Sequence, residues 1–162
     1  MSTIDELVRA NAAYAGTFDR GDLPMPPGRR LAIVTCMDAR IIPSRALGLE
    51  EGDAHVIRNA GGRARDALRS LVISQRLLGT NEIAVIHHTD CGMLTFTDEE
   101  FRQQIADDTG MKPEWASEAF TDLDADVRQS VARIKESPFV PKTDAVRGFI
   151  YEVESGRLRE VQ

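Results

Sequence analysis

Four apolar runs, each ending in polar or glycine-rich residues, set the pattern of this chain. They predict strands at residues 31–35, 54–58, 83–87 and 147–153. Between these runs, apolar residues recur at the spacing of a helix face. One such stripe comprises Leu68, Leu71, Val72 and Leu78, and another comprises Leu123, Val127, Val131 and Ile134. Strands that alternate with helices indicate βαβ units, and hence a mostly parallel sheet flanked by helices.

Polar residues and glycines mark the ends of the predicted elements. Asp66 is expected to cap the helix that Gly79 closes, and Thr97 with Glu100 forms a capping box for a further helix. The last predicted strand alternates apolar and polar residues before a turn at 155–156. Such alternation predicts an edge strand with one face in solvent.

The N-terminal segment differs from this core. Thr3 with Glu6 forms a capping box for a short helix, and residues 21–30 contain three prolines and two glycines, which predict an extended connector. We therefore expect a single domain with a helical arm at 1–20, this connector, and an α/β core at 31–162. A helix detached in this way is placed to lie on a neighbouring subunit.

Composition and charge narrow the class of protein. With 162 residues, 42% of them hydrophobic and 28% charged, the chain has the composition of one globular domain. The net charge of −6 argues against a nucleic-acid partner. No stretch reaches the roughly 20 apolar residues of a transmembrane helix, and the start lacks the basic and then apolar order of a signal peptide. We expect a cytoplasmic protein without a membrane partner.

Cys36, His88 and Cys91 are the candidate metal ligands. Cys36 follows the first predicted strand and His88 the third, and the carboxyl ends of parallel strands meet at one edge of a sheet. Two thiolates and one imidazole form a zinc set with one coordination position left, which is typical of a catalytic rather than a structural zinc. A disulfide between the two cysteines, or Cys36 acting as a nucleophile with His88, is an alternative interpretation, although a reducing compartment disfavours the disulfide.

Further candidates follow the first two strands. Asp38 and Arg40 come directly after Cys36 and are expected to pair, because buried charges need partners. A carboxylate at this position can accept a hydrogen bond from metal-bound water, or bind the metal itself and close the site. Gly61 and Gly62 follow the second strand, where their backbone amides can approach a small anion or bound substrate.

Three other polar residues lie close to the candidate ligands or at strand starts. Asp90, between His88 and Cys91, is a candidate for supporting the ligands. Alternation along a strand turns His87 away from the side that His88 faces, and His55 belongs to the start of another strand. Both histidines are candidate proton shuttles, but surface or packing roles are favoured.

The motifs CMDAR, RNAGG and HHTDCG, in this order and spacing, resemble the β-class carbonic anhydrases, and are most similar to their short bacterial and archaeal branch. The resemblance covers about residues 30–155. It implies four parallel strands plus one antiparallel edge strand, and a homodimer or larger assembly in which the N-terminal helix embraces the partner. It also implies Zn²⁺ on Cys36, His88 and Cys91, with water or hydroxide at the fourth position, or Asp38 in a closed state.

This resemblance implies reversible hydration of CO₂ to bicarbonate by a zinc-bound hydroxide, with Asp38 and Arg40 as a gating pair. Because two thiolates donate more charge than histidines would, we expect activity to rise above neutral pH. Related enzymes with the same zinc set hydrolyse COS or CS₂, and this is the first alternative. A closed, non-catalytic zinc site or a redox sensor is the second.

Overall fold

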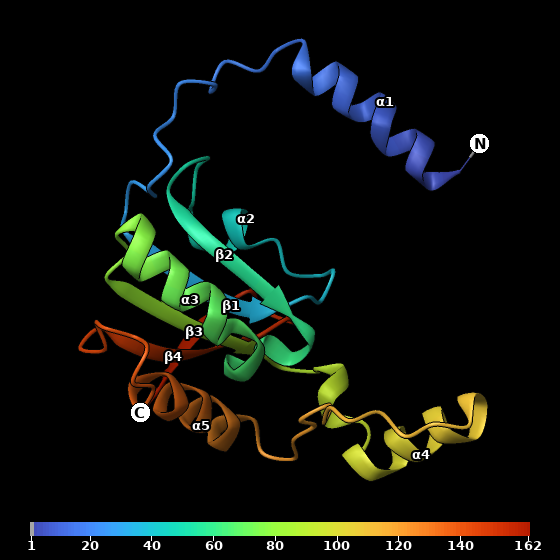
Figure 1. Cartoon of the computed structure of the whole chain (residues 1–162). Coiled ribbons are helices and arrows are strands. Elements are labelled where there is room, and N and C mark those ends of the chain that lie inside the picture. The colour runs from blue at the N-terminus through green and yellow to red at the C-terminus, as the bar shows by residue number, and fades with distance from the viewer. Residues whose placement is uncertain (1) are drawn as a thin grey trace.

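The chain folds around a five-stranded sheet with the strand order β2-β1-β3-β4-β5 (Figure 1). The computed structural model describes residues 2–162. The strands are β1 (Leu31–Cys36), β2 (Ala54–Asn59), β3 (Glu82–His88), β4 (Val146–Tyr151) and β5 (Leu158–Val161). The first four run parallel, and β5 pairs antiparallel with β4. The predicted fold class, a mostly parallel sheet with one antiparallel edge strand, is therefore confirmed.

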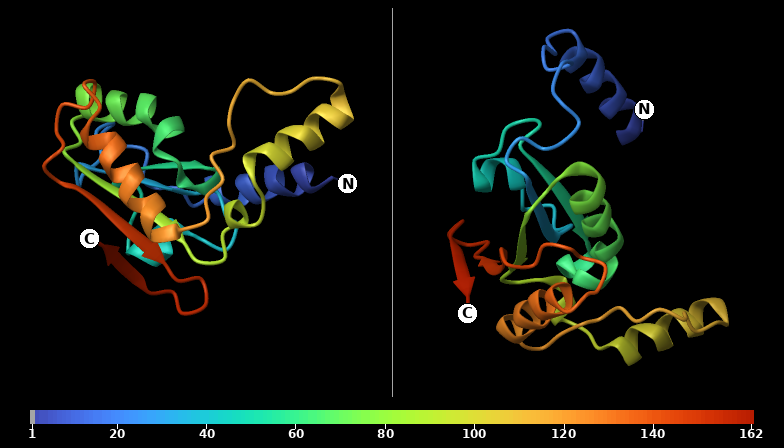
Figure 2. Two further views of the ribbon diagram at one scale, coloured as in Figure 1. Left: turned by 90° about the horizontal axis from the view of Figure 1, so that it is seen from below. Right: turned by 60° about the vertical axis from the view of Figure 1, so that its left-hand side comes forward.

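Helices either cover a face of this sheet or project from it. They are α1 (Thr3–Ala15), α2 (Pro43–Leu47), α3 (Ala64–Leu78), α4 (Asp98–Thr109) and α5 (Leu123–Lys135), with short 3₁₀ turns η1 (Ala60–Gly62) and η2 (Gly92–Leu94). α1 and α4 project from the sheet, whereas Figure 2 shows α3 and α5 side by side on one face and the short α2 on the other. The main core lies under α3 and α5, where Val34 and Val85 of the sheet meet Leu71 and Ile134. Both predicted apolar stripes are thus helix faces directed at the sheet.

The expected edge strand is an interior strand. β4 lies between β3 and β5, because the chain turns at 155–156 and returns as a short fifth strand. Gly156 has a φ of 71°, which glycine adopts without strain, and this permits the tight return. The alternation that predicted an edge has another cause: β4 buries one face against α5, and β5, whose residues are mostly exposed, is the edge strand.

Two predicted helix starts are shifted. Ser2, not Thr3, caps α1, in a capping box with Asp5. Asp66 lies in the first turn of α3, which begins directly after Arg63. The shift in α3 follows from the side chain of Asn59, which accepts from Arg63 N (2.6 Å) and donates to Arg63 O (3.0 Å), so the backbone is set for a helix that begins three residues earlier. The caps at Thr97 and Gly79 are confirmed.

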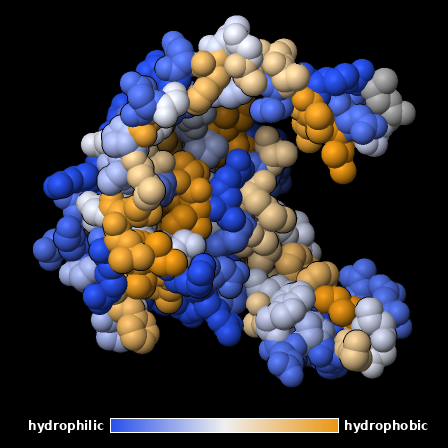
Figure 3. Space-filling view, turned by 45° about the horizontal axis from the view of Figure 1, so that its top comes forward, coloured by the Kyte–Doolittle hydropathy of each residue, from blue (hydrophilic) through white to orange (hydrophobic). Residues whose placement is uncertain are grey.

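α1 projects away from the sheet at the end of an extended segment (Figure 1). None of its residues is buried, and Ile4, Leu7 and Val8 are each more than 60% exposed. Figure 3 shows a hollow between this arm and the rest of the molecule. Tyr14 near the end of α1 donates a hydrogen bond to Glu51, which links the arm to the core. Among residues 2–162, no helix combines the length and the apolar character that crossing a bilayer requires.

Candidate metal centre

The pairing of β1 with β3 brings the three predicted ligands together. The two strands are parallel neighbours with Thr35 opposite Ile86, so Cys36 ends one strand where His88 ends the next. Cys91 follows on the turn after β3. The ligand atoms of Cys36, His88 and Cys91 all lie within 4.8 Å of one another, and all three residues are buried. Residues far apart in the sequence thus form one compact cluster.

The donor atoms of this cluster fit a metal ion. His88 Nδ1 lies 2.8 Å from the carbonyl of Thr89, which can only accept, so Nδ1 carries the ring proton and Nε2 keeps its lone pair. His88 Nε2 is buried, and no described residue gives it a hydrogen bond. A buried, unsatisfied ring nitrogen beside two sulfur atoms is the arrangement that a cation completes.

The two cysteines are free thiols and face each other. The pKa of Cys36 is lowered, first because Cys91 hydrogen-bonds to its sulfur, and the pKa of Cys91 is raised by the same contact. Without a cation, only one of the two sulfurs is therefore readily ionised. A divalent ion would remove this conflict, because it stabilises both thiolates at once.

The predicted pair of Asp38 and Arg40 is present beside the cluster. Arg40 Nε and Nη2 donate to the two oxygens of Asp38 at 3.0 and 2.8 Å, and the backbone N–H of Arg40 donates to Asp38 Oδ1 at 2.9 Å. These hydrogen bonds hold the pKa of Asp38 well below its ordinary value. Arg40 also donates to the Asp90 carboxylate (2.6 Å) and to the Asp90 carbonyl (2.9 Å). One guanidinium therefore joins the loop after β1 to the loop after β3.

Arg58 is a supporting residue that the sequence analysis missed. Its Nε donates to the carbonyl of Cys36 at 2.9 Å, and its Nη2 donates to the carbonyl of Asp38 at 2.7 Å. The side chain thus holds the backbone on both sides of Met37. The available signal was weak: an arginine near the end of the strand that pairs with β1, opposite Thr35 in register.

The Gly61–Gly62 turn lies directly beside Cys36. Both glycines have positive φ, 77° and 67°, which any other residue adopts only with strain. A Cβ on Gly62 would lie 3.0 Å from Thr35 C and 3.1 Å from Cys36 N. The backbone N–H of Gly61 contributes to lowering the pKa of Cys36. The turn therefore helps to fix the position of Cys36, in addition to any contact that Gly61 makes with a ligand.

An open cavity of about 800 Å³ lies over this cluster. Its lining residues include Cys36, Asp38, Arg40, Gly61 and Cys91. The remaining walls are largely apolar and include Met93 and Phe96. The arrangement can present a metal ion and an ionised carboxylate to a small molecule.

The two other histidines lie outside the cluster. His55 is near the start of β2, and its Nδ1 lies 2.8 Å from Ser74 Oγ. His87 is 1% exposed and contacts Asp126 of α5, so the predicted alternation with His88 is confirmed. Neither side chain lines the cavity over the metal cluster.

Comparisons with known proteins agree with this geometry. A profile of the carbonic anhydrase family matches residues 31–158. β-Carbonic anhydrase 1 of Mycobacterium tuberculosis is 54% identical over 99% of each chain. The carbon disulfide hydrolase of Saccharolobus solfataricus is 35% identical over 97% of this chain and 88% of that protein. The crystal structure of carbonic anhydrase from Streptococcus mutans matches with a TM-score of 0.93 at 48% identity, covering 100% of this chain and 99% of that one. The chain therefore belongs to the carbonic anhydrase family of enzymes, and within it to the β class.

Proposed function

We propose that this protein catalyses the zinc-dependent, reversible hydration of CO₂ to bicarbonate and a proton. The observation that carries the proposal is the convergence of the Cys36, His88 and Cys91 ligand atoms within 4.8 Å, beside an open cavity. The 54% identity to a β-carbonic anhydrase over nearly the whole chain supports the same activity.

Three side chains would hold the zinc ion: Cys36 and Cys91 through sulfur, and His88 through Nε2. When bound, zinc supplies the acidification of a water ligand to a pKa of roughly 7, so that a nucleophile for CO₂ is available near neutral pH. Three protein ligands leave one coordination position for this purpose.

Asp38 and Arg40 would control access to that position. Asp38 is the carboxylate nearest to the cluster, with Oδ2 3.8 Å from His88 Nε2. Because Arg40 donates to both of its oxygens, Asp38 stays ionised and is restrained beside the cluster by these hydrogen bonds. From there it can accept a hydrogen bond from the reacting water and orient it. Arg40 also donates a hydrogen bond to Asp90, so the Asp38–Arg40 pair is attached to the loop after β3.

Hydrolysis of CS₂ or COS is the second candidate. It is favoured by the 35% identity to a carbon disulfide hydrolase. Both molecules are linear analogues of CO₂ and need the same nucleophile. The cavity over the cluster, at about 800 Å³, has room for either substrate.

One experiment tests these proposals together. Zinc content is determined in the same sample used for stopped-flow CO₂ hydration from about pH 6.5 to about pH 9, and sulfide release from CS₂ is measured in parallel. Fast hydration that rises above neutral pH, with one zinc per chain, is the expected result. Sulfide release without CO₂ hydration would move the assignment to the second candidate. Full zinc with neither reaction would indicate a closed, non-catalytic site. Removal of zinc by a chelator should abolish turnover, and its return should restore it.

We further propose a homodimer or larger assembly in which α1 packs on a second subunit. The exposed apolar side chains of Ile4, Leu7 and Val8 on a projecting helix support this arrangement. We propose the cytoplasm as the location, because a reducing compartment keeps both thiols available for zinc.

A further inference from the structure

A second cluster of charged side chains is buried on the opposite side of β3 from His88. The side chains of Arg63, His87 and Asp126 are 6%, 1% and 3% exposed, and Glu118 closes the cluster at 15%. Burying charges is unfavourable unless partners compensate. The proposed reaction uses none of these four residues, so their arrangement needs another physical reason.

Asp126 contacts both Arg63 and His87 in this cluster. Arg63 Nη1 donates to Asp126 Oδ1, and Arg63 Nε donates to Glu118 Oε2 at 3.1 Å. His87 Nδ1 lies 3.0 Å from Asp126 Oδ2, although the two atoms are not aligned as a hydrogen bond. Burial raises the pKa of the Asp126 carboxyl, but the contacts with His87 and Arg63 together lower it by more, so the pKa lies below its ordinary value. Asp126 is therefore a carboxylate.

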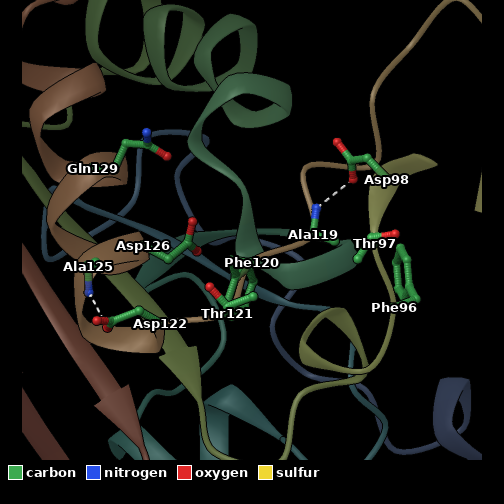
Figure 4. A pocket seen from close by; sticks show the side chains of 10 residues that line it. All are labelled: Phe96, Thr97, Asp98, Ala119, Phe120, Thr121, Asp122, Ala125, Asp126 and Gln129. Carbon is green, nitrogen blue, oxygen red and sulfur yellow. Dashed lines mark hydrogen bonds between the residues drawn. The ribbon is translucent and has the colours of Figure 1, made fainter. Parts of the chain in front are cut away.

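Asp126 differs from the two other carboxylates that line the same pocket. Figure 4 shows this pocket between the start of α4 and the start of α5. Asp98 accepts from the backbone N–H of Ala119 at 2.9 Å, and Asp122 accepts from Ala125 N–H at 2.9 Å. These two carboxylates are used to hold the chain, so the three do not form a cation site. Asp126 is the carboxylate whose partners lie in the interior of the protein.

The other end of His87 reaches the turn beside Cys36. His87 Nε2 lies 3.2 Å from the carbonyl of Gly62, and because a carbonyl only accepts, Nε2 carries the donated proton. The opposite ring nitrogen, Nδ1, faces the Asp126 carboxylate, so the ring spans the distance between Asp126 and the turn. Phe120 stacks on the ring with centroids 6.0 Å apart, and the guanidinium of Arg63 lies over the same Phe120 ring. The orientation of His87 is thus fixed from three directions.

The carbonyl that His87 holds belongs to the turn that contacts Cys36. Gly62 packs so tightly on the end of β1 that an added Cβ would lie 3.1 Å from Cys36 N. The backbone N–H of the preceding residue, Gly61, lies close enough to the Cys36 sulfur to lower the pKa of that thiol. A hydrogen bond to a ligating thiolate orients the sulfur and reduces the charge that it donates to a metal. The turn must therefore be held still for the sulfur to be placed correctly.

We propose that the buried chain from Asp126 through His87 to the Gly61–Gly62 turn positions the Cys36 sulfur for metal binding. Arg63 secures Asp126 at the far end of this chain. His87 and Asp126 are positioning residues, because they touch neither substrate nor metal and act through the Gly61 amide. The inference rests on the proposed function, since the sulfur that is positioned is one of the proposed zinc ligands.

Four variants separate this role from simple packing. His87→Phe keeps a ring against Phe120 but removes the donor to Gly62, whereas His87→Gln keeps a donor. Asp126→Asn removes the carboxylate charge with little change in shape. His55→Gln is the matched control, because His55 sits near the opposite end of a strand and pairs with Ser74. Three readouts apply to each variant: zinc affinity by chelator competition, the sulfur-to-metal charge-transfer band of the cobalt form, and the NMR resonance of the Gly61 amide.

The expected result is a graded loss. His87→Phe should weaken zinc binding roughly tenfold, the low end for the loss of an outer hydrogen bond that orients a metal ligand. It should also move the cobalt band to lower energy, because an unbonded thiolate donates more charge, and shift the Gly61 amide resonance. His87→Gln should recover most of the effect, Asp126→Asn should be intermediate, and His55→Gln should match the parent.

Unchanged zinc affinity, cobalt band and Gly61 resonance in folded His87→Phe would overturn the proposal. If that variant does not fold, Asp126→Asn decides by the same three readouts, and parent values there would also overturn it. If the parent itself binds no zinc, the proposed function fails. The positioning role is then judged separately, because the Gly61 resonance of metal-free variants must still shift.

Discussion

Replacing Gly62 with alanine perturbs the metal centre through the backbone alone. Gly62 has a φ of 67°, and at such a φ a residue with a Cβ costs about 1–2 kcal/mol. The new Cβ would also lie 3.0 Å from Thr35 C and 3.1 Å from Cys36 N. Both contacts are tighter than ordinary packing, and backbone at the end of a central strand cannot rotate away. Overpacking of this kind adds about 1–3 kcal/mol.

The free energy of unfolding of Gly62→Ala should therefore fall by about 2–5 kcal/mol. For a domain of this size, each kcal/mol corresponds to about 2–4 °C in Tm, so a fall of roughly 4–20 °C is expected. Gly79→Ala is the matched control, since Gly79 has a φ of 75° but nothing within 4 Å of an added Cβ. That variant carries only the conformational cost of about 1–2 kcal/mol.

Two assays complete the comparison. Urea unfolding of the metal-free proteins measures the loss of stability, and chelator competition measures zinc affinity. Gly62→Ala should lose affinity roughly tenfold, because Cys36 must shift with its own amide nitrogen, whereas Gly79→Ala should bind zinc like the parent. Equal stability loss and equal zinc affinity in the two variants would refute the argument that the turn supports Cys36.

Three further predictions follow from the described contacts. Arg40→Ala should retain zinc but lose most CO₂ hydration, because Asp38 is released to take the fourth coordination position. Arg45→Ala on α2 is the control, and full turnover in Arg40→Ala would contradict the gating role. The lowered pKa of Asp126 means that its folded form binds fewer protons than the unfolded chain, so its stabilising contribution is present above about pH 4 and is lost as pH falls through the lowered pKa. In urea unfolding of metal-free protein, the stability difference between the parent and Asp126→Asn should therefore shrink on acidification, and a difference that is independent of pH would count against this account. Deleting residues 1–20 should yield monomers or insoluble protein in analytical ultracentrifugation, and an unchanged dimer would exclude exchange of the arm.

The ligand cluster was predictable because buried parallel strands leave a clear pattern. Their apolar runs stand out from the sequence, and the runs of β1 and β3 end at residues that can bind metal, Cys36 and His88. Parallel pairing then requires Cys36 and His88 to meet at one edge, whatever the details of the intervening chain. The Asp38–Arg40 contact was equally local, since a single residue lies between the two charged residues.

Features that depend on distant partners were not predictable in this way. β5 is four residues long and mostly exposed, so it has no apolar run, and only its pairing with β4 makes it a strand. Arg58 and Asp126 look like ordinary surface charges in the sequence. Their roles arise from contacts with Cys36 and His87, which come from other elements and follow no periodic pattern.

The uneven spacing of the three ligands has a consequence for the order of events in folding. His88 and Cys91 are three residues apart, whereas Cys36 joins them only after β1 and β3 have paired through the crossover that contains β2 and α3. An unfolded chain can offer a metal the local pair, because closing that short loop costs little entropy, but bringing in Cys36 requires a much longer loop. The difference in metal affinity between the native and the unfolded chain is therefore expected to come chiefly from the Cys36 thiolate, which joins the other two ligands last. The moment at which a refolding chain acquires its sulfur-to-metal absorption would therefore time the formation of the central strand pair.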